Sequence, residues 1–441
     1  MERDLYKELL AWRVSAFRKP LVVRGARQTG KTYLLREFGG REYRRCHSFN
    51  FEQDPRLGSL FANDLSPVRI LRDLTLYGGN EIRASEDLLI FDEIQECNDA
   101  LNALKYFQEQ ANDYQIVAAG SLLGVAMSRP KSFPVGKVDF LDLHPMTFYE
   151  FLDAVGQGGI RTYLATLESI APLPDALHQQ LIGLLRRYYF VGGMPEAVLR
   201  HVADPAGGDC RIVQRAILDS YALDFAKHAP AFDIPKLSLL WKSLPSQLAR
   251  ENKKFLFSLA RKGARAREYE NALTWLVHAG LIHRCSLVTA PKIPLVAHAD
   301  GSNFKLYACD VGLLGALSGA PADAVQSDLS ILTEYHGAFV ENYVAQHLWA
   351  LFRSDLHYWK NVGREAEVDF LLPSASEILP IEAKSGMNVR SKSLAFYASK
   401  YHPSLTIRLS LRNLKIDGRV LNVPLYALQS LPQLLKLASG T

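Results

Sequence analysis

The feature that most constrains this chain is a glycine-rich turn between an apolar run and a helical pattern. Residues Leu21–Phe38 read LVVRGARQTGKTYLLREF, in which Gly25, Gly30, Lys31 and Thr32 fit the pattern GxxxxGK followed by Ser or Thr. Backbone N–H groups of such a turn, with the positive end of the following helix, cradle anionic phosphates. The stretch therefore predicts a strand–turn–helix unit that binds the phosphates of a nucleotide.

The residues of this turn have distinct expected roles. Glycine lets the backbone bend and approach phosphate oxygens closely. Lys31 is expected to reach the β- and γ-phosphates and to assist catalysis, and Thr32 to ligate Mg²⁺. The residues expected to line the nucleotide site are Gly25, Ala26, Arg27, Gln28, Thr29, Gly30, Lys31, Thr32 and Tyr33. In the following helix, Leu34, Leu35 and Phe38 fall on one face, so we expect them to pack under the sheet.

Length and composition indicate a multi-domain globular protein. The chain has 441 residues, and a length of about 150 residues per domain suggests two to four domains. Its 48 % hydrophobic and 22 % charged content is that of a soluble protein. The net charge of +5 permits contact with nucleic acid but does not by itself argue for it.

Cysteine spacing and hydropathy indicate in which cellular compartment the protein is expected. The five cysteines form no CxxC pair, which argues against a zinc site or a disulfide framework and favours the reduced cytoplasm. The N-terminal segment carries acidic residues, unlike a signal peptide. No uninterrupted apolar run approaches the ~18 residues of a membrane span. We therefore expect a cytoplasmic protein with no membrane contact.

Two further strands end in polar residues that suit a nucleotide site. The apolar run Leu88–Phe91 ends in Asp92 and Glu93, and the carboxyl ends of parallel strands face the ligand crevice. Asp92 is expected to hold Mg²⁺ through water, and Glu93 to orient and activate the attacking water. The later run Ile116–Ala119 leads to Ser121, a candidate sensor of the γ-phosphate. A helix N-cap is the alternative role of this serine.

These segments together resemble the AAA-type ATPase module of a widespread group of prokaryotic predicted ATPases. The resemblance rests on GARQTGKT, LLIFDEIQE, AAGSLLG and LDLHPMTFYEFL. In that group the module precedes a C-terminal domain of unknown function, and it is similar overall to the archaeal ATPase branch of the AAA superfamily. The resemblance implies ATP as the nucleotide, Mg²⁺ as the cofactor and ATP hydrolysis as the reaction, and it is compatible with oligomer formation.

The resemblance also draws attention to arginines. A Gly-Arg pair often precedes the LxPLSFxEF segment in the family, and here the pair is Gly136–Lys137. Lysine lacks the planar fork of arginine, so it is a weaker arginine finger, and Arg129 is the alternative. The GGMPE segment belongs to a helical lid in that group, with Arg186 or Arg187 as a second sensor. An ordinary helix end and restart is the competing interpretation.

The region from 209 to 325 predicts helices followed by strands, in an order that resembles a winged helix. We expect a helix after Ser246, a hairpin around Asp300–Gly301 and a short final helix. Basic residues cluster near the expected recognition helix, and they are Lys253, Lys254, Arg261, Lys262, Arg265 and Arg267. This cluster suits contact with DNA phosphates. A solvated basic face or a protein contact is the alternative.

The C-terminal region carries carboxylates at a spacing that suits a metal. Asp369, in the expected strand EVDFLL, precedes a hairpin whose return strand carries Glu382 and Lys384, and residues i and i+2 share one face of a sheet. Two carboxylates beside a lysine suit a hard cation and a water nucleophile. This D…ExK arrangement resembles the PD-(D/E)XK nuclease superfamily, and Glu341 on the preceding helix matches its additional acidic residue.

The resemblance implies a nuclease site with catalytic residues Glu341, Asp369, Glu382 and Lys384 and with Asp369 and Glu382 as metal ligands. The same fold also serves as an inert binding module, and a weak strand salt bridge is the structural alternative. Arg364 and the segment that contains Asn388, Arg390 and Lys392 are candidate contacts to DNA phosphate.

The sequence thus predicts an α/β protein with four parts. They are a P-loop AAA-type parallel-sheet ATPase core at 1–155, a helical lid at 156–208, a winged-helix-like domain at 209–325 and a nuclease-like domain at 326–441. The leading hypothesis is Mg²⁺-dependent ATP hydrolysis that controls a DNA-binding or nuclease-like C-terminal part. The alternative is a slow nucleotide-dependent switch that binds protein partners and has an inactive nuclease-like domain.

Overall fold

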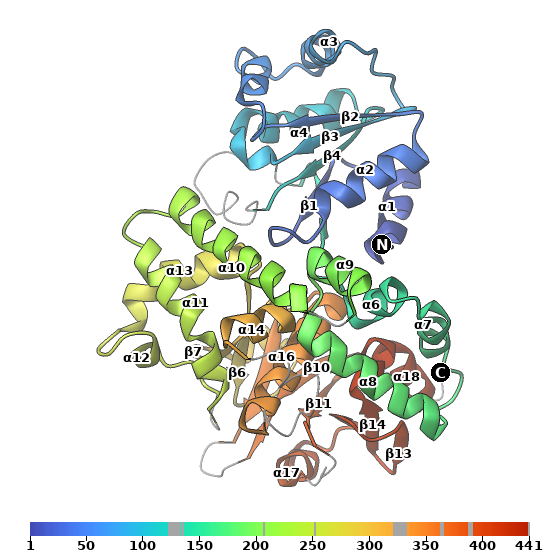
Figure 1. The fold of residues 1–441 in the computed structure, drawn as a ribbon, viewed down its shortest axis with the longest axis vertical. Coiled ribbons are helices and arrows are strands. Elements are labelled where there is room, and N and C mark those ends of the chain that lie inside the picture. The colour runs from blue at the N-terminus through green and yellow to red at the C-terminus, as the bar shows by residue number, and fades with distance from the viewer. Residues whose placement is uncertain are drawn as a thin grey trace. The chain divides into compact units, whose positions relative to one another are not determined.

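The chain folds into two compact units, drawn in Figure 1. The computed structural model describes residues 1–121, 134, 136–205, 208–250, 253–320, 333–361, 366–386 and 391–439. Unit 1 consists of Met1–Pro145 and His278–Gly280, and unit 2 of Met146–Val277 and Leu281–Thr441.

Unit 1 is built on a five-stranded sheet with the strand order β2-β3-β4-β1-β5. All neighbouring strands of this sheet are parallel. The strands are β1 (Leu21–Arg24), β2 (Arg45–Asn50), β3 (Asp87–Asp92), β4 (Gln115–Ala119) and β5 (Asp139–Asp142). Because β1, β4 and β3 are adjacent and parallel, their carboxyl ends meet at one edge of the sheet, as the sequence predicts.

Helices cover both faces of this sheet. They are α1 (Leu5–Val14), α2 (Lys31–Glu42), η1 (Pro55–Phe61), α3 (Pro67–Gly78), η2 (Ile94–Glu96) and α4 (Asn98–Gln110). Val22 and Phe91 face an apolar layer that includes η1, α3 and α4. Val23 and Ile90, one residue away, face the layer formed with α1 and α2. This alternation with a period of two residues produces the α/β fold that the sequence predicts.

The helix after the glycine-rich turn packs as expected. The three predicted contact residues belong to the α1–α2 layer, and they are Leu34, Leu35 and Phe38. None of them is more than 1 % exposed.

Unit 2 combines many helices with two sheets. The helices are α6 (Phe148–Ala154), α7 (Gly158–Ala165), α8 (Asp175–Val191), α9 (Pro195–Ala203), α10 (Gly208–His228), α11 (Ile234–Leu248), α12 (Phe257–Ala260), α13 (Ala266–His278), η3 (Leu295–His298), α14 (Val311–Leu317), α16 (Thr333–Phe352), α17 (Lys392–Tyr401), η5 (Leu425–Ser430) and α18 (Leu431–Ser439). The predicted helices before and after the C-terminal strands correspond to α16 and α17 and are confirmed.

The two sheets of unit 2 have the orders β7-β6-β8-β9 and β10-β11-β12-β14-β13. Their strands are β6 (Ile282–Val288), β7 (Ala299–Ala308), β8 (Leu356–Lys360), β9 (Glu367–Val368), β10 (Phe370–Ser374), β11 (Glu377–Ala383), β12 (Thr406–Ser410), β13 (Lys415–Asp417) and β14 (Val420–Pro424). The first sheet joins β6 and β7, from the expected winged-helix region, to β8 and β9, from the expected nuclease-like region. The two regions therefore share a sheet.

The expected strand EVDFLL is divided at Asp369. Glu367–Val368 pairs with β8 in the first sheet, whereas Phe370–Ser374 pairs with β11 in the second. The prediction of one continuous strand is wrong because its two ends pair with different partners. The Asp369 carboxylate accepts a hydrogen bond from the N–H of Ala383, at the end of β11, over 2.9 Å.

The prediction of a helix that begins after Ser246 is also wrong. Ser246 lies in the last turn of α11, which continues through Pro245 and ends at Leu248. Leu240 and Leu244 lie on the buried side of this helix. Their packing outweighs the helix-breaking tendency of proline, whose missing N–H costs most in a helix interior.

Asp300–Gly301 forms no hairpin turn. The pair lies within β7, where the register with β6 shifts between Ser286 and Leu287. The Asp300 carboxylate accepts from the N–H of Ser302 over 2.7 Å. The strand pairing is therefore irregular at this point, and the irregularity uses the same residue types as a turn. The short helix expected at the end of this region is α14 and is confirmed.

The two glycines of GGMPE lie where three segments meet. The N–H of Met146 donates to the Gly193 carbonyl, and the N–H of Gly193 donates to the Asp310 carboxylate, each over 2.6 Å. A Cβ atom on Gly193 would lie 2.0 Å from the Met146 carbonyl oxygen, and one on Gly192 would lie 2.2 Å from Asp310 Oδ1. The glycines thus permit a close backbone approach, while the role of this segment as a nucleotide lid stays a prediction.

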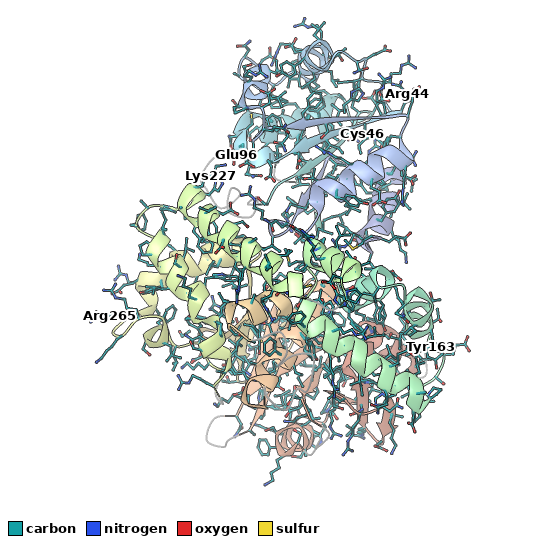
Figure 2. All side chains as sticks on the ribbon, viewed as in Figure 1. Arg44, Cys46, Glu96, Tyr163, Lys227 and Arg265 are labelled. Atoms are coloured by element: carbon teal, nitrogen blue, oxygen red, sulfur yellow. The ribbon has the colours of Figure 1, made fainter. Side chains whose placement is uncertain are left out.

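All five cysteines lie within the described residues, and none forms a disulfide. Cys46, labelled in Figure 2, lies on β2 of unit 1.

We predict that Gly193→Ala destabilises unit 2 by about 3 kcal/mol, because the new methyl group overlaps the Met146 carbonyl. Gly183→Ala is the matched control, since this glycine lies inside α8 and a methyl group added there would meet nothing within 4 Å. It should change stability by no more than about 1 kcal/mol, in the stabilising direction. Urea unfolding followed by tryptophan fluorescence measures both, because four of the five tryptophans belong to unit 2. Equal midpoints for the two variants would contradict the steric explanation.

Candidate active site

The loop between β1 and α2 contains glycines where side chains do not fit. Gly25 has φ +145°, and a Cβ atom there would lie 2.1 Å from the Leu143 carbonyl oxygen. Gly30, directly before α2, has φ 92° in the left-handed region. Glycine adopts such angles without the steric cost of a side chain. The backbone conformation of the loop therefore explains why glycine occurs at both positions.

A network of hydrogen bonds holds the loop. The Thr29 hydroxyl donates to the Ala26 carbonyl over 2.9 Å. The Arg3 guanidinium donates to the Thr29 carbonyl over 2.7 Å. Arg27 forms an ion pair with Glu52 at 3.7 Å. The sequence interpretation missed Arg3, because nothing in its local sequence links it to a loop that follows a helix and a strand.

Lys31 is almost fully buried at the base of the loop, with 6 % exposure. Its ammonium donates to the carbonyls of Gly25 and Ala26 over 2.9 and 2.8 Å. Burial lowers the pKa of Lys31 to about 8, although Glu93 and Asp92 act in the opposite direction. The ammonium therefore lies next to the loop that would hold phosphate, with neutral oxygens as its hydrogen-bond partners.

The structure brings Thr32 and Asp92 together. The Thr32 hydroxyl donates to the Asp92 carboxylate, 3.0 Å from Oδ2 and 3.2 Å from Oδ1. The Asn50 amide also donates to Asp92 Oδ2, over 3.1 Å. Burial and the neighbouring Glu93 raise the pKa of Asp92. Hydroxyl and carboxylate oxygens are ligands that suit Mg²⁺, so this donor set fits the predicted metal. Asn50 had not been predicted.

Glu93 and Ser121 are also neighbours. Glu93 has φ 50°, an uncommon left-handed conformation for this residue type. Its Oε2 accepts from the Gln95 amide over 2.6 Å and lies 3.4 Å from the Ser121 hydroxyl. All predicted polar residues of the site thus lie at one edge of the sheet, and their individual roles stay predictions.

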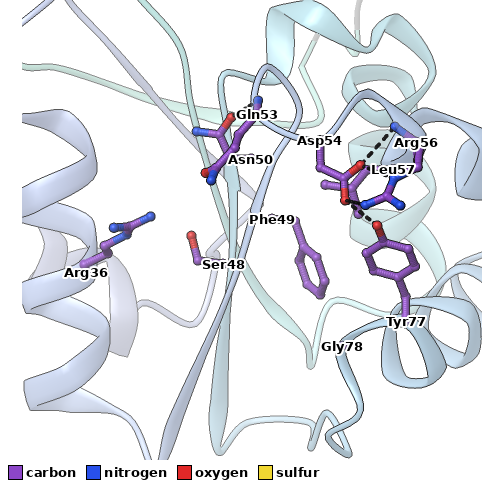
Figure 3. Close-up of a pocket in the computed structure, with 10 residues that line it drawn as sticks. All are labelled: Arg36, Ser48, Phe49, Asn50, Gln53, Asp54, Arg56, Leu57, Tyr77 and Gly78. Carbon is purple, nitrogen blue, oxygen red and sulfur yellow. Dashed lines mark hydrogen bonds and ion pairs between the residues drawn. The ribbon is translucent and has the colours of Figure 1, made fainter.

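A separate polar pocket of about 430 Å³ adjoins β2, the edge strand of the unit 1 sheet (Figure 3). Asp54 accepts hydrogen bonds from Arg56 and Tyr77 on one side of it. Asn50 lines this pocket and also contacts Asp92. The pocket therefore shares one residue with the surroundings of the candidate metal ligand.

The candidate arginine-finger and sensor residues lie in different parts of the chain. Lys137, which replaces the family arginine, forms an ion pair with Glu109 at 3.0 Å within unit 1. Arg129 lies outside the described residues. Arg186 and Arg187 are exposed on α8 in unit 2, and a role as second sensor stays a prediction.

The four nuclease-like residues occur in one largely buried cluster. Lys384 pairs with Glu382 at 2.6 Å, which places both on the face predicted from their spacing. Asp369 contacts the backbone between them. Burial raises the pKa of Asp369 well above its usual value, and Glu341 and Glu382 raise it further. Lys384 has a raised pKa because the same carboxylates outweigh its burial.

Lys253 was predicted to belong to the basic cluster near the expected recognition helix, but its side chain is not on the surface. Its side chain is 12 % exposed and forms an ion pair with Glu341. The prediction failed because a run of charge in the sequence does not reveal which member faces inward. Arg364, Asn388 and Arg390 lie outside the described residues, and Lys392 is exposed at the start of α17.

The remaining basic cluster lies around α12 and the start of α13. Its exposed members are Arg261, Lys262, Arg265 and Arg267. None of the four forms an ion pair within the part of the chain that the structure describes. Arg265 points away from the body of unit 2 in Figure 2. These side chains are therefore accessible to an external anion.

The first part of the chain matches a known protein family. The AAA domain family model matches residues 17–152, which contain the loop, Asp92, Glu93 and Ser121. Residues 17–152 form an AAA-type P-loop ATPase domain. The protein is therefore an ATPase. The candidate nucleotide site at the carboxyl edge of the unit 1 sheet lies within the matched residues.

The rest of the chain matches two families without an assigned function. Residues 182–324 match a domain of unknown function (DUF8612), and residues 336–428 match another (DUF4143). A search of curated proteins found no match. No helix in the described ranges has both the length and the apolar character needed to cross a bilayer.

Several solved structures are similar to parts of the chain. A Walker-type ATPase of Pyrococcus abyssi has 14 % identity and a TM-score of 0.43, over 72 % of this chain and 95 % of that one. The RuvB Holliday junction branch migration motor of Thermotoga maritima has 15 % identity and a TM-score of 0.31, over 66 % and 90 %. The Orc1 protein of Aeropyrum pernix in complex with DNA has 14 % identity and a TM-score of 0.28, over 73 % and 91 %.

We predict that ATP binding weakens as the pH rises above 8. Below its pKa of about 8 in the nucleotide-free state, Lys31 carries the charge that attracts phosphate, and above it the group must take up a proton to bind. Affinity should fall by up to about tenfold per pH unit between pH 8.5 and 9.5. Calorimetry in two buffers of different ionisation enthalpy measures both the affinity and the proton uptake.

Lys31→Arg is the control for this measurement, because a guanidinium stays charged throughout the range. The variant should bind more weakly at neutral pH but show little dependence on pH. An equally steep loss of affinity in wild type and variant would show that another group titrates.

Proposed function

We propose that this protein is an ATP-dependent switch in which the nucleotide state of unit 1 controls contact between unit 2 and DNA. The observation that carries the proposal is the set of exposed basic side chains around α12 and α13. An ATPase domain in the same chain supplies the two states, with and without a γ-phosphate, on which such control depends.

The proposed roles within unit 1 follow from the local geometry. The loop N–H groups and Lys31 bind the phosphates, and Thr32 and Asp92 hold Mg²⁺. When bound, Mg²⁺ neutralises charge on the phosphate oxygens. Glu93 orients and activates the attacking water, and its contacts with Gln95 and Ser121 fix the direction of its carboxylate. In this proposal Ser121 senses the γ-phosphate, and its contact with Glu93 supports that role.

We predict that Glu93→Gln lowers the ATP turnover rate at least about a hundredfold while ATP binding is retained, since the amide keeps the shape but loses the basic oxygen. Glu96→Gln is the matched control, because Glu96 is exposed three residues further along the chain. It should leave turnover unchanged. Phosphate release and fluorescent-nucleotide binding measure the two properties separately. Full turnover in Glu93→Gln would remove this residue from the mechanism.

Contact with DNA rests on simple electrostatics. Lys and Arg side chains that bind DNA phosphates release condensed counterions, so affinity falls steeply with salt. A protein surface as the partner releases far fewer ions. Salt dependence therefore separates the proposed function from the alternative in which the switch binds a protein.

We predict that Arg265→Ala with Arg267→Ala weakens DNA binding and reduces the slope of log affinity against log salt by about 2, one for each lost phosphate contact. The control is Arg419→Ala with Lys436→Ala, which removes the same charge from exposed positions elsewhere in unit 2. Fluorescence anisotropy with a labelled duplex, in ATP and in ADP, measures affinity and its dependence on nucleotide. Identical slopes for both double variants would refute the proposed surface.

A switch that binds a protein partner is the second candidate. The ion pair between Lys137 and Glu109 favours it, since this residue is engaged within its own unit and lacks the arginine fork. Slow turnover without salt-dependent DNA binding would support this candidate.

A further inference from the structure

We infer that the buried ammonium groups of Lys305 and Lys253 are the built-in cations of the carboxylate cluster in unit 2, and that they replace the metal ion expected from its D…ExK pattern. This inference goes beyond the proposed function and does not depend on it. It concerns what neutralises Glu341 and Asp369, since Glu382 is paired with Lys384.

Lys305 lies among three carboxylates. It is 1 % exposed on β7. Its ammonium is 2.6 Å from Glu367 Oε1, 3.7 Å from Glu341 Oε2 and 3.9 Å from Asp369 Oδ1. The Tyr358 ring lies 4.9 Å away and adds a cation–π contact. This is the arrangement of a central cation with acidic neighbours on several sides.

Lys253 supplies the second positive charge. Its ammonium forms an ion pair with Glu341 Oε1 and donates to the Gly337 carbonyl over 3.3 Å. The other oxygen of Glu341 accepts from the Tyr307 hydroxyl over 3.0 Å. Both oxygens of Glu341 are therefore engaged by groups of the protein itself.

The oxygens left over do not make a metal site. Asp369 Oδ2 accepts from the Ala383 N–H, and Glu382 Oε1 is paired with Lys384. Glu382 Oε2 is buried without a hydrogen-bond partner among the described residues. A hard divalent cation can keep several waters but still needs one or two carboxylate oxygens that are free to bind it. The described residues contain no group of three or more His, Cys, Asp or Glu that could hold a metal ion.

An ammonium beside these carboxylates also repels a second cation, and the repulsion is strong where water is excluded. The expected metal therefore does not fit the donor set of this chain. The cluster is charge-compensated without it, and the orphaned Glu382 oxygen marks where a cation would enter if a lysine were removed.

The cations and the carboxylates come from different parts of the chain. Lys253 and Lys305 lie in the region 182–324, whereas Glu341, Asp369 and Glu382 lie in the region 336–428. The compensation therefore also joins these two regions, in addition to the sheet that they share. A C-terminal region prepared alone would keep Lys384 but would lack the two buried cations Lys253 and Lys305.

The test is Mn²⁺ binding by the nucleotide-free full-length chain, followed by electron paramagnetic resonance. Wild type and Asp369→Asn should bind Mn²⁺ equally, because the cluster contributes no site. Lys305→Met should gain one site that binds at least about tenfold more tightly than any wild-type site, since the repelling charge is gone. Lys305→Met with Asp369→Asn should lose that site again.

The matched control is Lys360→Met, which removes a lysine from the same partner, Glu367, at 3.6 Å but from a more exposed position. It should gain no site. Mn²⁺ should also raise the Tm of Lys305→Met and leave that of wild type unchanged, because a ligand stabilises only the state that binds it.

Two results would overturn the inference. One is Mn²⁺ binding to wild type that weakens in Asp369→Asn. The other is a folded Lys305→Met variant that gains no site. If the buried carboxylates prevent Lys305→Met from folding, the comparison of wild type with Asp369→Asn still decides, and Lys253→Met provides a less buried lysine for the same measurement.

Discussion

The hydrogen bond between the Thr32 hydroxyl and the Asp92 carboxylate depends on the order of strands in the unit 1 sheet. Thr32 follows β1, Asp92 ends β3, and the parallel strand β4 lies between them. The apolar side chains of these strands alternate between two layers, and this alternation fixes which residues point where. A register shift of one residue in β3 would exchange its two faces and separate Asp92 from Thr32. The geometry of the candidate site is thus a consequence of apolar packing.

Unit 2 shows a different constraint, which is the compensation of buried charge. Removing an ion from water costs several kcal/mol and is tolerated only when partners with good geometry surround it. Lys305 on β7, Glu341 on α16 and Glu367 on β9 meet this condition only when all three elements are in place. Regions that match separate family models therefore fold as one unit, since neither can bury its charges without the other.

The sequence predicts local structure well where neighbouring residues alone determine it. The loop before α2, the strand that ends at Asp92 and the helix α16 were predicted because glycine spacing and apolar periodicity act over neighbouring residues. Arg3 and Asn50 were missed because they reach the site only through the tertiary fold. At Asp300–Gly301 the residue types of a turn occur, but they form an irregularity within a strand instead of a hairpin turn.

The contrast between two buried lysines explains why motifs predict the first site better than the second. Lys31 is part of the local glycine-rich motif. Its hydrogen-bond partners are neutral carbonyl oxygens, so the effect of burial exceeds that of Glu93 and Asp92 and lowers the Lys31 pKa. Lys305 is likewise buried, but Glu341, Glu367 and Asp369 outweigh burial and raise its pKa. A buried ammonium with a lowered pKa still lacks a full counter-charge, which an anionic ligand supplies. A buried ammonium with a raised pKa already has its negative counter-charge from carboxylates of the protein. The D…ExK pattern specifies two carboxylates and Lys384, but the cations next to Glu341 and Asp369 come from residues far away in the chain.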